Sequence, residues 1–499
     1  MDVQGQQRRT IAELEAENAG QRKEIEGQCE RIADLVVEVD HLRGLVSELQ
    51  AKLNTSSKNS SAPPSSDSPG KKAQARKSRS ERRREERAKL KAGVRRRGKQ
   101  PGAPGKNLSM RDDPDNIVPH DPPQCSGCGK DLLGAEQVGD PERRQVLDIP
   151  DPKLICTEHQ GIRRRCSCGT VTTGEFPPEA KAPVSYGPNV RANTLYLLHG
   201  QHLSVERTAE AMSAMLGVAV SVGFVSSLVA EAAGRLGGFM EQLRGLLRGT
   251  DVIHVDETPD QVRTDTWYFH VVASELYTYL FASHTRAKTA PDAAGVLPEF
   301  RGTMVHDRLS MYWNYKKATH AICNAHIVRD LDGVAVIASQ EQWAQGMKAL
   351  LLEMNNACHE ARAAGRQRLS RRKLKRFLER YDALVTAALA ANPKPVGRER
   401  DYLERKSYNL AAALGKLRAE ATLFARDLRV PFTNNEAERP LRMAKLHKKI
   451  SGCFQADDHA KHFAAIRSYL STARKHDVGA LEVLALLFRG DVWMPPART

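Results

Sequence analysis

The sequence predicts a multidomain α/β protein, and three observations lead to that prediction. Its 499 residues leave room for several domains. Apolar runs typical of strands lie between residues 251 and 306, and helical patterns precede and follow them. Ahead of residue 180 the composition changes twice, from a heptad pattern to a basic stretch rich in Ser and Pro, and then to a cysteine-bearing segment.

Residues 1–54 are predicted to form a coiled coil. From Ile11 to Leu53 one heptad frame holds, and ten of its thirteen a and d positions are apolar. This pattern is expected of a helix that buries a narrow seam against a partner. A helix folded back on its own chain is the alternative, but residues 55–108 offer it almost no large apolar side chain. The pattern therefore favours a homo-oligomer.

Residues 55–108 are predicted to be a disordered linker, because so few apolar side chains cannot offset the entropy of ordering. Of the net charge of +16, a local +12 arises between Lys71 and Lys99, where fifteen Lys or Arg face three Glu. Such a tether binds DNA phosphates without reading sequence, and a merely solvated charge run is the alternative. The arginines expected to contact DNA are Arg82, Arg83, Arg84, Arg95, Arg96 and Arg97.

Residues 109–178 are predicted to be a zinc ribbon. Cys125 and Cys128 form a CxxC-Gly turn, and Cys166 and Cys168 form a second turn about forty residues later. Two such turns supply four thiolates to one structural Zn²⁺, and the glycines allow the tight backbone around the sulfurs. Because the second pair is CxC, replacement of one ligand by Cys156 or His159 stays open, as does the alternative of buried free cysteines.

No export or membrane signal is present in the sequence. The N-terminus carries no apolar core after its charges, and no stretch approaches the roughly 18 apolar residues of a membrane span. Nine cysteines in so long a chain, four of them in two tight pairs, do not predict a disulfide framework. We therefore expect a cytoplasmic protein with reduced thiols and no membrane partner.

Residues 179–248 are predicted to be helical and include a candidate helix-turn-helix. A helix, a turn at Gly217 and a second helix starting near Ser221 follow one another. The expected second helix contains no Arg or Lys, so packing explains the pattern about as well as DNA recognition does. Both interpretations stay open.

Residues 249–450 carry the candidate catalytic carboxylates. Asp256 follows the apolar run of a buried strand, and Asp307 follows "GTMV" in the same way. Two carboxylates from neighbouring strand ends, joined by a third from a helix, can hold two divalent cations about 4 Å apart for in-line attack on a phosphodiester. Mg²⁺ suits such all-oxygen ligands. Taken singly, an aspartate after a strand more often caps a turn.

The third carboxylate is expected within "NNEAERPLR", which offers Glu436 and Glu438. On a helix these two lie about 200° apart, so only one can face the strand ends. Lys445 returns to within about 20° of Glu438, which gives that glutamate a basic partner suited to a phosphate. The alternative for Glu438 is a capping box with Asn435, and Pro440 allows a later start or a kink of the helix.

Taken together, these motifs resemble those of insertion-sequence-66 family transposases, which are bacterial DDE enzymes. The motifs "KNSSAPPSSDSPG", "RRGKQPGAPG", the paired cysteines, "HVDETP", "GTMVHD", "CNAHIVRDL" and "VPFTNNEAERPLR" follow in that family's order over nearly the whole chain. The resemblance implies an RNase H-like core over about 249–330 and 425–450, with a helical insertion over about 331–424. Residues 451–499 resemble the family's C-terminal segment, and the catalytic carboxylates fall on Asp256, Asp307 and Glu438.

The resemblance also implies a function. We expect two Mg²⁺ or Mn²⁺ ions to activate water that cuts double-stranded DNA at the element ends, after which the freed 3′-OH attacks target DNA. Lys445 is expected to contact DNA near the scissile phosphate, and Arg442 is expected to bind DNA as well. The protein is expected to be nucleoid-associated in the bacterial cytoplasm, and a need for helper proteins from the same element stays open. His326, in the C-x-x-H of "CNAH", resembles a motif of several DDE enzymes or is a core histidine. The alternatives are a catalytically inactive DNA-binding regulator and a DNA-bridging protein that use the zinc ribbon, coiled coil and linker.

Overall fold

The computed structural model describes residues 27, 28, 31, 34, 38, 108–149, 154–177, 180, 182–335, 340–394 and 402–497, with side chains from 406 in the last range. The chain divides into two units, one comprising Met1–Asp67 with Leu154–Thr499 and the other Ser68–Lys153. The predicted coiled coil lies outside the described residues except at five positions, which are helical, and the predicted linker lies outside them except at residue 108.

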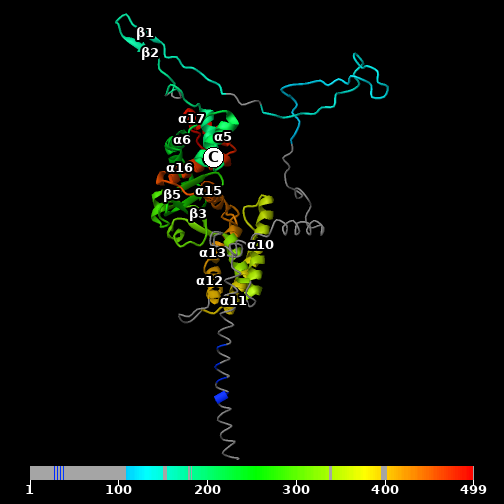
Figure 1. Ribbon diagram of the computed structural model, residues 1–499. Helices are drawn as coiled ribbons and strands as arrows, with labels where there is room; N and C mark the ends of the chain where they lie inside the picture. The colour runs from blue at the N-terminus through cyan, green and yellow to red at the C-terminus, as the bar shows by residue number, and fades with distance from the viewer. Residues whose placement is uncertain are drawn as a thin grey trace, which may run out of the picture. The chain divides into compact units, whose positions relative to one another are not determined.

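A five-stranded mixed sheet forms the centre of the larger unit (Figure 1). The strand order is β5-β4-β3-β6-β7, with β3, β4 and β5 antiparallel and with β6 and β7 running parallel to β3. The strands are β3 (Val252–Val262), β4 (Asp265–Ala273), β5 (Thr278–Ser283), β6 (Thr303–His306) and β7 (Thr319–Ile322). The first four coincide with the strand-like runs of the sequence, so those predictions are confirmed.

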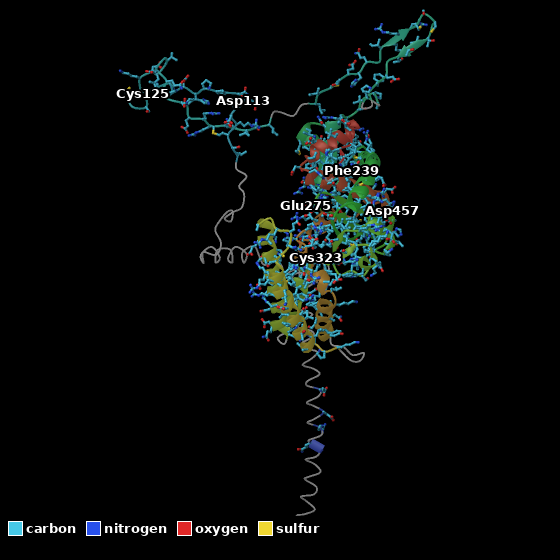
Figure 2. The ribbon with its side chains drawn as sticks, turned by 180° about the vertical axis from the view of Figure 1, so that it is seen from behind. Asp113, Cys125, Phe239, Glu275, Cys323 and Asp457 are labelled. Atoms are coloured by element: carbon cyan, nitrogen blue, oxygen red, sulfur yellow. The ribbon has the colours of Figure 1, made fainter. Side chains whose placement is uncertain are left out.

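Strand β3 divides its side chains between two cores because successive residues point to opposite faces of a sheet. Ile253 and Val255 pack on one face, against a set of helices that carries the largest core of the protein. Phe239, labelled in Figure 2, is fully buried in this core. The helices are α4 (Pro188–Leu195), α6 (Val222–Arg235), α7 (Gly237–Arg248), α16 (Asp457–Lys475) and α17 (Ala480–Arg489).

The other face of β3, β4 and β5 is covered by α15 (Asn435–Ser451) and the start of α16. Ala437, Leu441 and Ala444 of α15 are buried there at helical spacing, against side chains that include Phe269 and Leu280. Small alanines let the helix lie close to the strands. This packing brings the NNEAER segment to the sheet.

Helix α15 is unbroken at Pro440, the sixth residue of the helix. Proline within a helix removes the hydrogen bond to the carbonyl four residues earlier. The helix nevertheless starts at Asn435, so a start beyond the proline is excluded.

Helices fill the chain between β7 and α15, as predicted for residues 331–424. They enclose a second core together with Val305, Ala321 and Ile322 of β6 and β7. The helices are α9 (Asn324–Ala335), α10 (Glu341–Ala363), α11 (Arg371–Ala391), α12 (Tyr402–Lys416), α13 (Arg418–Ala421) and α14 (Leu423–Arg426). This core continues under the parallel edge of the sheet.

The predicted helix–turn–helix is present as α5 (Val205–Leu216) and α6. Gly217 adopts a left-handed conformation (φ 61°) that ends α5, and the Ser221 side chain accepts a hydrogen bond from the backbone of Phe224 at the start of α6. The only basic residue of α6 is Arg235, which pairs with Glu231. The charges of α6 therefore give no support to DNA recognition by this helix.

No helix in the described ranges is long and apolar enough to cross a membrane.

Candidate active site and metal centres

Asp256 and Asp307 come from neighbouring parallel strands. Ile253 pairs with Met304 and His254 with Val305, so the same register continued by two residues aligns Asp256 with Asp307 directly after β6. Since side chains alternate along a strand, both carboxylates belong to the face that α15 covers. One carboxylate of the predicted pair thus lies within β3 rather than at its end.

The two aspartates are partly buried and lie close to other negative charges. Burial raises the pKa of Asp256 well above its usual range, and the charges of Glu257, Asp307 and Glu438 raise it further. Burial followed by the Glu257 charge raises the pKa of Asp307. Such carboxylates favour a bound cation, because each ionised group lacks sufficient positive charge nearby.

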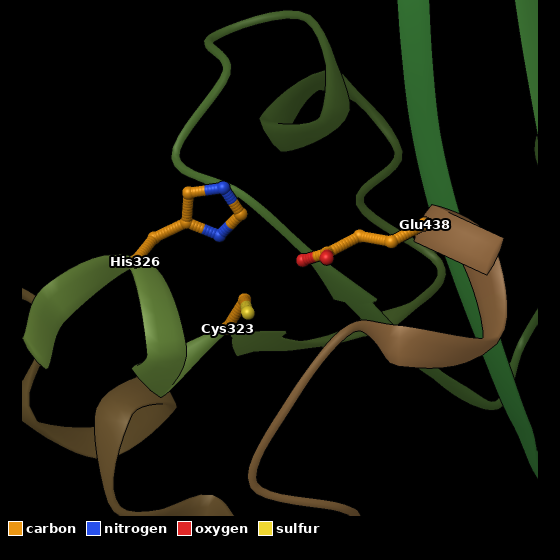
Figure 3. A group of neighbouring side chains, drawn as sticks. All are labelled: Cys323, His326 and Glu438. Carbon is orange, nitrogen blue, oxygen red and sulfur yellow. The ribbon is translucent and has the colours of Figure 1, made fainter. Parts of the chain in front are cut away.

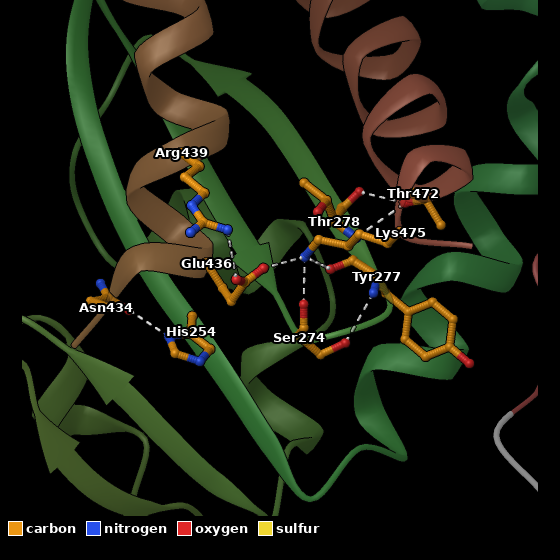
Figure 4. A network of polar contacts seen from close by, with 9 residues as sticks. All are labelled: His254, Ser274, Tyr277, Thr278, Asn434, Glu436, Arg439, Thr472 and Lys475. Carbon is orange, nitrogen blue, oxygen red and sulfur yellow. Dashed lines mark hydrogen bonds and ion pairs between the residues drawn. The ribbon is translucent and has the colours of Figure 1, made fainter. Parts of the chain in front are cut away.

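Asn434 fixes the start of α15 against β3. Its side chain is fully buried, donates to the Val255 carbonyl at 2.8 Å and contacts Nδ1 of His254 at 3.0 Å through its oxygen (Figure 4). Its backbone N–H donates to the Cys323 sulfur at 3.2 Å. Asn434 is the N-cap of α15, and its side chain makes no capping hydrogen bond to the helix. Because Asn435 is already the first helical residue, the alternative of a capping box with Asn435 is wrong.

Glu436 and Glu438 reach different partners from the first turn of α15. Glu436 forms an ion pair with Lys475 of α16 at 2.9 Å and a longer one with Arg439 (Figure 4). Glu438 points instead toward the strand ends, its side chain is 18% exposed, and its nearest cation is Arg442 at 3.5 Å. The two glutamates therefore have different surroundings, and Glu436 is engaged in an ion pair with another helix.

Glu438 lies beside Cys323 and His326 (Figure 3). One ligand atom from each of these three residues lies within 4.8 Å of the other two, and among the residues with described side chains no other trio of His, Cys, Asp or Glu meets that criterion. Asp256, Asp307 and Glu438 therefore do not converge as closely.

Sequence reasoning missed a second acidic contact in this region. The Glu257 carboxylate is almost fully buried, accepts from the Arg286 guanidinium at 2.9 Å and accepts from the Tyr312 hydroxyl at 2.8 Å. Glu257 follows Asp256 directly, so strand alternation directs it to the opposite face. The two adjacent acids in "HVDET" could have indicated this contact. The basic partner of Glu257, Arg286, lies 29 residues later in the chain and could not be identified from the sequence.

The first pair of predicted zinc ligands lies on a tight turn in the smaller unit. The Cys125 backbone N–H donates to the Lys130 carbonyl, and Gly129 (φ 74°) donates back to the Cys125 carbonyl, both at 2.8 Å. Backbone N–H groups of Gly127 and Cys128 lower the pKa of the Cys125 thiol. The turn thus presents a thiol that readily ionises.

The second pair lies between β1 (Arg163–Arg165) and β2 (Val171–Thr173) of the larger unit. The Cys166 backbone N–H donates to the Thr170 carbonyl at 2.8 Å, and Gly169 (φ 89°) donates to the Cys166 carbonyl at 2.9 Å. Hydrogen bonding with Thr170 lowers the pKa of the Cys168 thiol to about 7. Both turns thus close through the same two backbone hydrogen bonds, and the second turn is one residue shorter than the first.

All four of these cysteines are free thiols, and Cys128, Cys166 and Cys168 are exposed. The alternative of buried free cysteines is therefore wrong. Cys156 and His159 are exposed as well, so both remain accessible as alternative zinc ligands.

The sequence model of the Transposase IS66 family matches residues 183–462, more than half of the chain. The chain belongs to the IS66 transposase family. A second model, the zinc-finger binding domain of transposase IS66, matches residues 122–169, and a family of unknown function matches residues 6–109. No curated protein matches the chain.

Membership of the IS66 transposase family confirms the resemblance seen in the motifs. It identifies an enzyme of the transposase kind that binds DNA and uses a divalent metal, and the zinc-finger match supports a zinc ion. The alternatives of an inactive regulator and a bridging protein are not favoured by these matches.

The DNA-contacting residues predicted for this IS66-family chain fall in two places. Arg442 and Lys445 are exposed on α15, where Arg442 approaches the Glu438 carboxylate. Leu441 and Ala444, on the other side of the helix, are buried against the sheet. The six linker arginines lie outside the described residues.

Proposed function

We propose that the protein cuts and joins the ends of an insertion sequence, with Asp256, Asp307 and Glu438 as its catalytic carboxylates. The observation that carries this proposal is the register of β3 and β6, which aligns the two aspartates on the face covered by α15. Asn434 ties the first turn of α15 to β3 at Val255, one residue before Asp256. Glu438 follows four residues later.

The core is proposed to be RNase H-like. Three antiparallel strands followed by two strands parallel to the first, in the order β5-β4-β3-β6-β7, support this assignment. The helices between β7 and α15 separate the second aspartate from the glutamate in sequence, as a helical insertion within such a core does. We propose residues 249–450 as the catalytic domain, with residues 179–248 and 451–499 as helical flanks.

Asp256, Asp307 and Glu438 would hold two Mg²⁺ or Mn²⁺ ions. The donor set fits, because it offers partly buried carboxylates that repel one another and a buried Glu438 Oε1 that has no hydrogen-bond partner. When bound, the ions supply an activated nucleophile and stabilise the attacking and leaving oxygens of a phosphodiester. The exposed side chains of Arg442 and Lys445 would hold the DNA phosphates beside these carboxylates.

One structural Zn²⁺ is proposed on Cys125, Cys128, Cys166 and Cys168, with Cys156 and His159 as the alternative ligands for the CxC turn. The lowered thiol pKa values of Cys125 and Cys168 support this assignment, since zinc binds the thiolate. The linker arginines are proposed to add contacts to element ends and target DNA that do not read sequence. The N-terminal heptads are proposed to join copies of the chain.

Incubation of the purified protein with Mg²⁺ and a labelled duplex carrying the element's terminal repeats tests the proposal. We expect nicks at the repeat ends and, with target DNA added, joined products. A shuffled duplex of the same composition is the control. Equal cutting of both duplexes, or none of either, would contradict the proposal.

A further inference from the structure

A second metal-binding group lies at the edge of the acidic site, formed by Cys323, His326 and Glu438 (Figure 3). Cys323 joins the end of β7 to the start of α9, His326 lies in the first turn of α9, and Glu438 comes from the first turn of α15. Their ligand atoms lie within 4.8 Å of one another. Sulfur, imidazole nitrogen and carboxylate oxygen together form a donor set that zinc accepts.

The backbone holds the cysteine and the histidine in place. The Cys323 N–H donates to the His306 carbonyl at 2.8 Å, and the next residue donates to the Phe432 carbonyl at 3.0 Å. Residues three apart at the start of a helix lie on the same side of it, so the C-x-x-H spacing directs both ligands to one point. Bonds from β6 and from the segment before α15 thus fix this corner.

Two of the three side chains have a buried polar atom without a partner. Nδ1 of His326 and Oε1 of Glu438 are both buried and make no hydrogen bond. Leaving such groups unsatisfied is unfavourable, and a shared ligand would satisfy both. The remaining Glu438 oxygen reaches only the exposed Arg442, at 3.5 Å.

The donor atoms select the kind of cation. A thiol sulfur and an imidazole nitrogen suit a borderline or soft ion such as zinc, whereas a hard ion such as Mg²⁺ prefers carboxylate, carbonyl and water oxygens.

We propose that Cys323, His326 and Glu438 bind one thiophilic divalent cation, Zn²⁺ or Co²⁺, in a site that is separate from the cysteine turns and shares Glu438 with the proposed Mg²⁺ site. Three protein ligands leave a fourth position for water. Because Glu438 is shared, an occupied site withdraws this carboxylate from Asp256 and Asp307. Zn²⁺ then inhibits Mg²⁺-dependent cleavage, a consequence that rests on the proposed function, whereas binding itself does not.

Titration of the full-length zinc-loaded protein with Co²⁺ tests the binding. We expect one additional Co²⁺ per chain, with a sulfur-to-cobalt charge-transfer band, and retention of the original zinc by elemental analysis. Cys323→Ser should lose the band and weaken binding at least about tenfold. Cys358→Ser is the matched control, since Cys358 is also buried but lies on α10.

A second variant guards against misfolding of Cys323→Ser. His326→Gln should weaken Co²⁺ binding while leaving the thermal unfolding midpoint close to that of the wild type, because His326 is partly exposed. Identical stoichiometry and spectra for the wild type and both variants would overturn the site.

Cleavage measurements test the inhibition separately. With Mg²⁺ in excess, micromolar Zn²⁺ should suppress nicking by the wild type and by Cys358→Ser but not by Cys323→Ser. Co²⁺ binding without this difference would overturn the inhibition and leave the site intact. A wild type that binds Co²⁺ as expected yet never nicks DNA with Mg²⁺ would instead overturn the proposed function.

Discussion

The acidic site and the two cysteine turns obtain their geometry in different ways. Asp256 is held in the central strand, and Glu438 is tied to that strand through the buried Asn434. The cysteine turns are held by hydrogen bonds within a few residues, and three of their four thiols are exposed. Packing of the core therefore fixes the geometry of the acidic site. The geometry of the cysteine turns is instead expected to depend on a metal ion bound by their sulfurs.

A bound cation should therefore stabilise the folded protein in a different way at each site. In the acidic site, folding has already brought repelling carboxylates together, so a cation relieves an existing cost. Little apolar surface is buried at the cysteine turns. Close to the turns in sequence, Leu133, Val138 and Ile155 are exposed. We expect metal binding at these turns to contribute folding free energy directly.

The largest expected effect is on catalysis. Asp256→Asn should lower the nicking rate by on the order of 10³-fold, because metal assistance contributes several kcal/mol of transition-state stabilisation. Asp307→Asn and Glu438→Gln should match it, and combinations should be no worse, since the three act as one unit. Nicking of the terminal-repeat duplex is measured beside DNA affinity, which should stay near the wild-type value. Additive losses would contradict a shared site.

The next effect concerns the cysteine turns. Purified protein should contain about one Zn²⁺ per chain, and Cys125→Ser with Cys128→Ser should release it and unfold residues around the turn. Elemental analysis and limited proteolysis between residues 109 and 178 measure the two outcomes. Cys453→Ser, at a half-buried cysteine of the larger unit, is the control. A folded, protease-resistant segment in metal-free wild type would show that the turns need no metal.

Asn434→Ala should weaken both stability and catalysis. It leaves the Val255 carbonyl and the His254 ring without their partner, at about 1–3 kcal/mol for each buried group. It also frees the turn that carries Glu438, so nicking should slow. Thermal unfolding and nicking are compared with Asn435→Ala, whose neighbouring side chain is exposed. Equal melting temperatures and equal nicking rates for the two variants would show that Asn434 does not position Glu438.

Asp256→Asn should also stabilise the metal-free protein at neutral pH. Because the folded state raises the pKa of Asp256, the folded state holds this proton more tightly than the unfolded state. Stability therefore falls as pH rises from about 3.9, the usual aspartate pKa, to the raised value, and the full cost persists above it. Removing the charge should raise the melting temperature by about 2–4 °C for each kcal/mol recovered.

Added Mg²⁺ should raise the melting temperature of the wild type and not that of Asp256→Asn. Measurement of both proteins from pH 5 to 8 with and without Mg²⁺ tests these signs. A metal-free variant that melts below the wild type at pH 7 would contradict the inferred charge repulsion.

The sequence predicted the elements of the larger unit well where apolar periodicity was strong. The runs around Asp256 and before Asp307 became β3 and β6, and the spacing of Glu436 and Glu438 separated the two glutamates. These features depend on strand and helix periods, which a sequence displays directly.

Long-range partners could not be predicted in the same way. Asn435 was the candidate cap residue, yet the N-cap is Asn434, whose side chain bonds to β3, 179 and 180 residues away in sequence. Glu257 and Arg286 meet only because the sheet folds. Polar contacts of this kind carry no periodic signal, so the ion pair of Glu436 with Lys475 could not be predicted either.

The smallest expected effect is that of Glu436→Gln, which tests the division between the two glutamates. Glu436 pairs with Lys475, whose ammonium is mostly buried and also donates to the carbonyls of Ser274 and Tyr277. The substitution should cost about 1 kcal/mol, less than the 3–5 kcal/mol of a fully buried pair, because Glu436 is about a third exposed. Nicking should be retained.

Glu438→Gln is the matched control, two residues away, and should show the reverse pattern of near-wild-type stability without nicking. In a Lys475→Met background, Glu436→Gln should cost less than in the wild type, since the two residues share one ion pair. Thermal unfolding and nicking are measured for the wild type, Glu436→Gln, Glu438→Gln, Lys475→Met and the Glu436→Gln/Lys475→Met double variant. If Glu436→Gln abolishes nicking and Glu438→Gln retains it, the third carboxylate is Glu436, and α15 must turn its other side to Asp256 and Asp307 in the active complex.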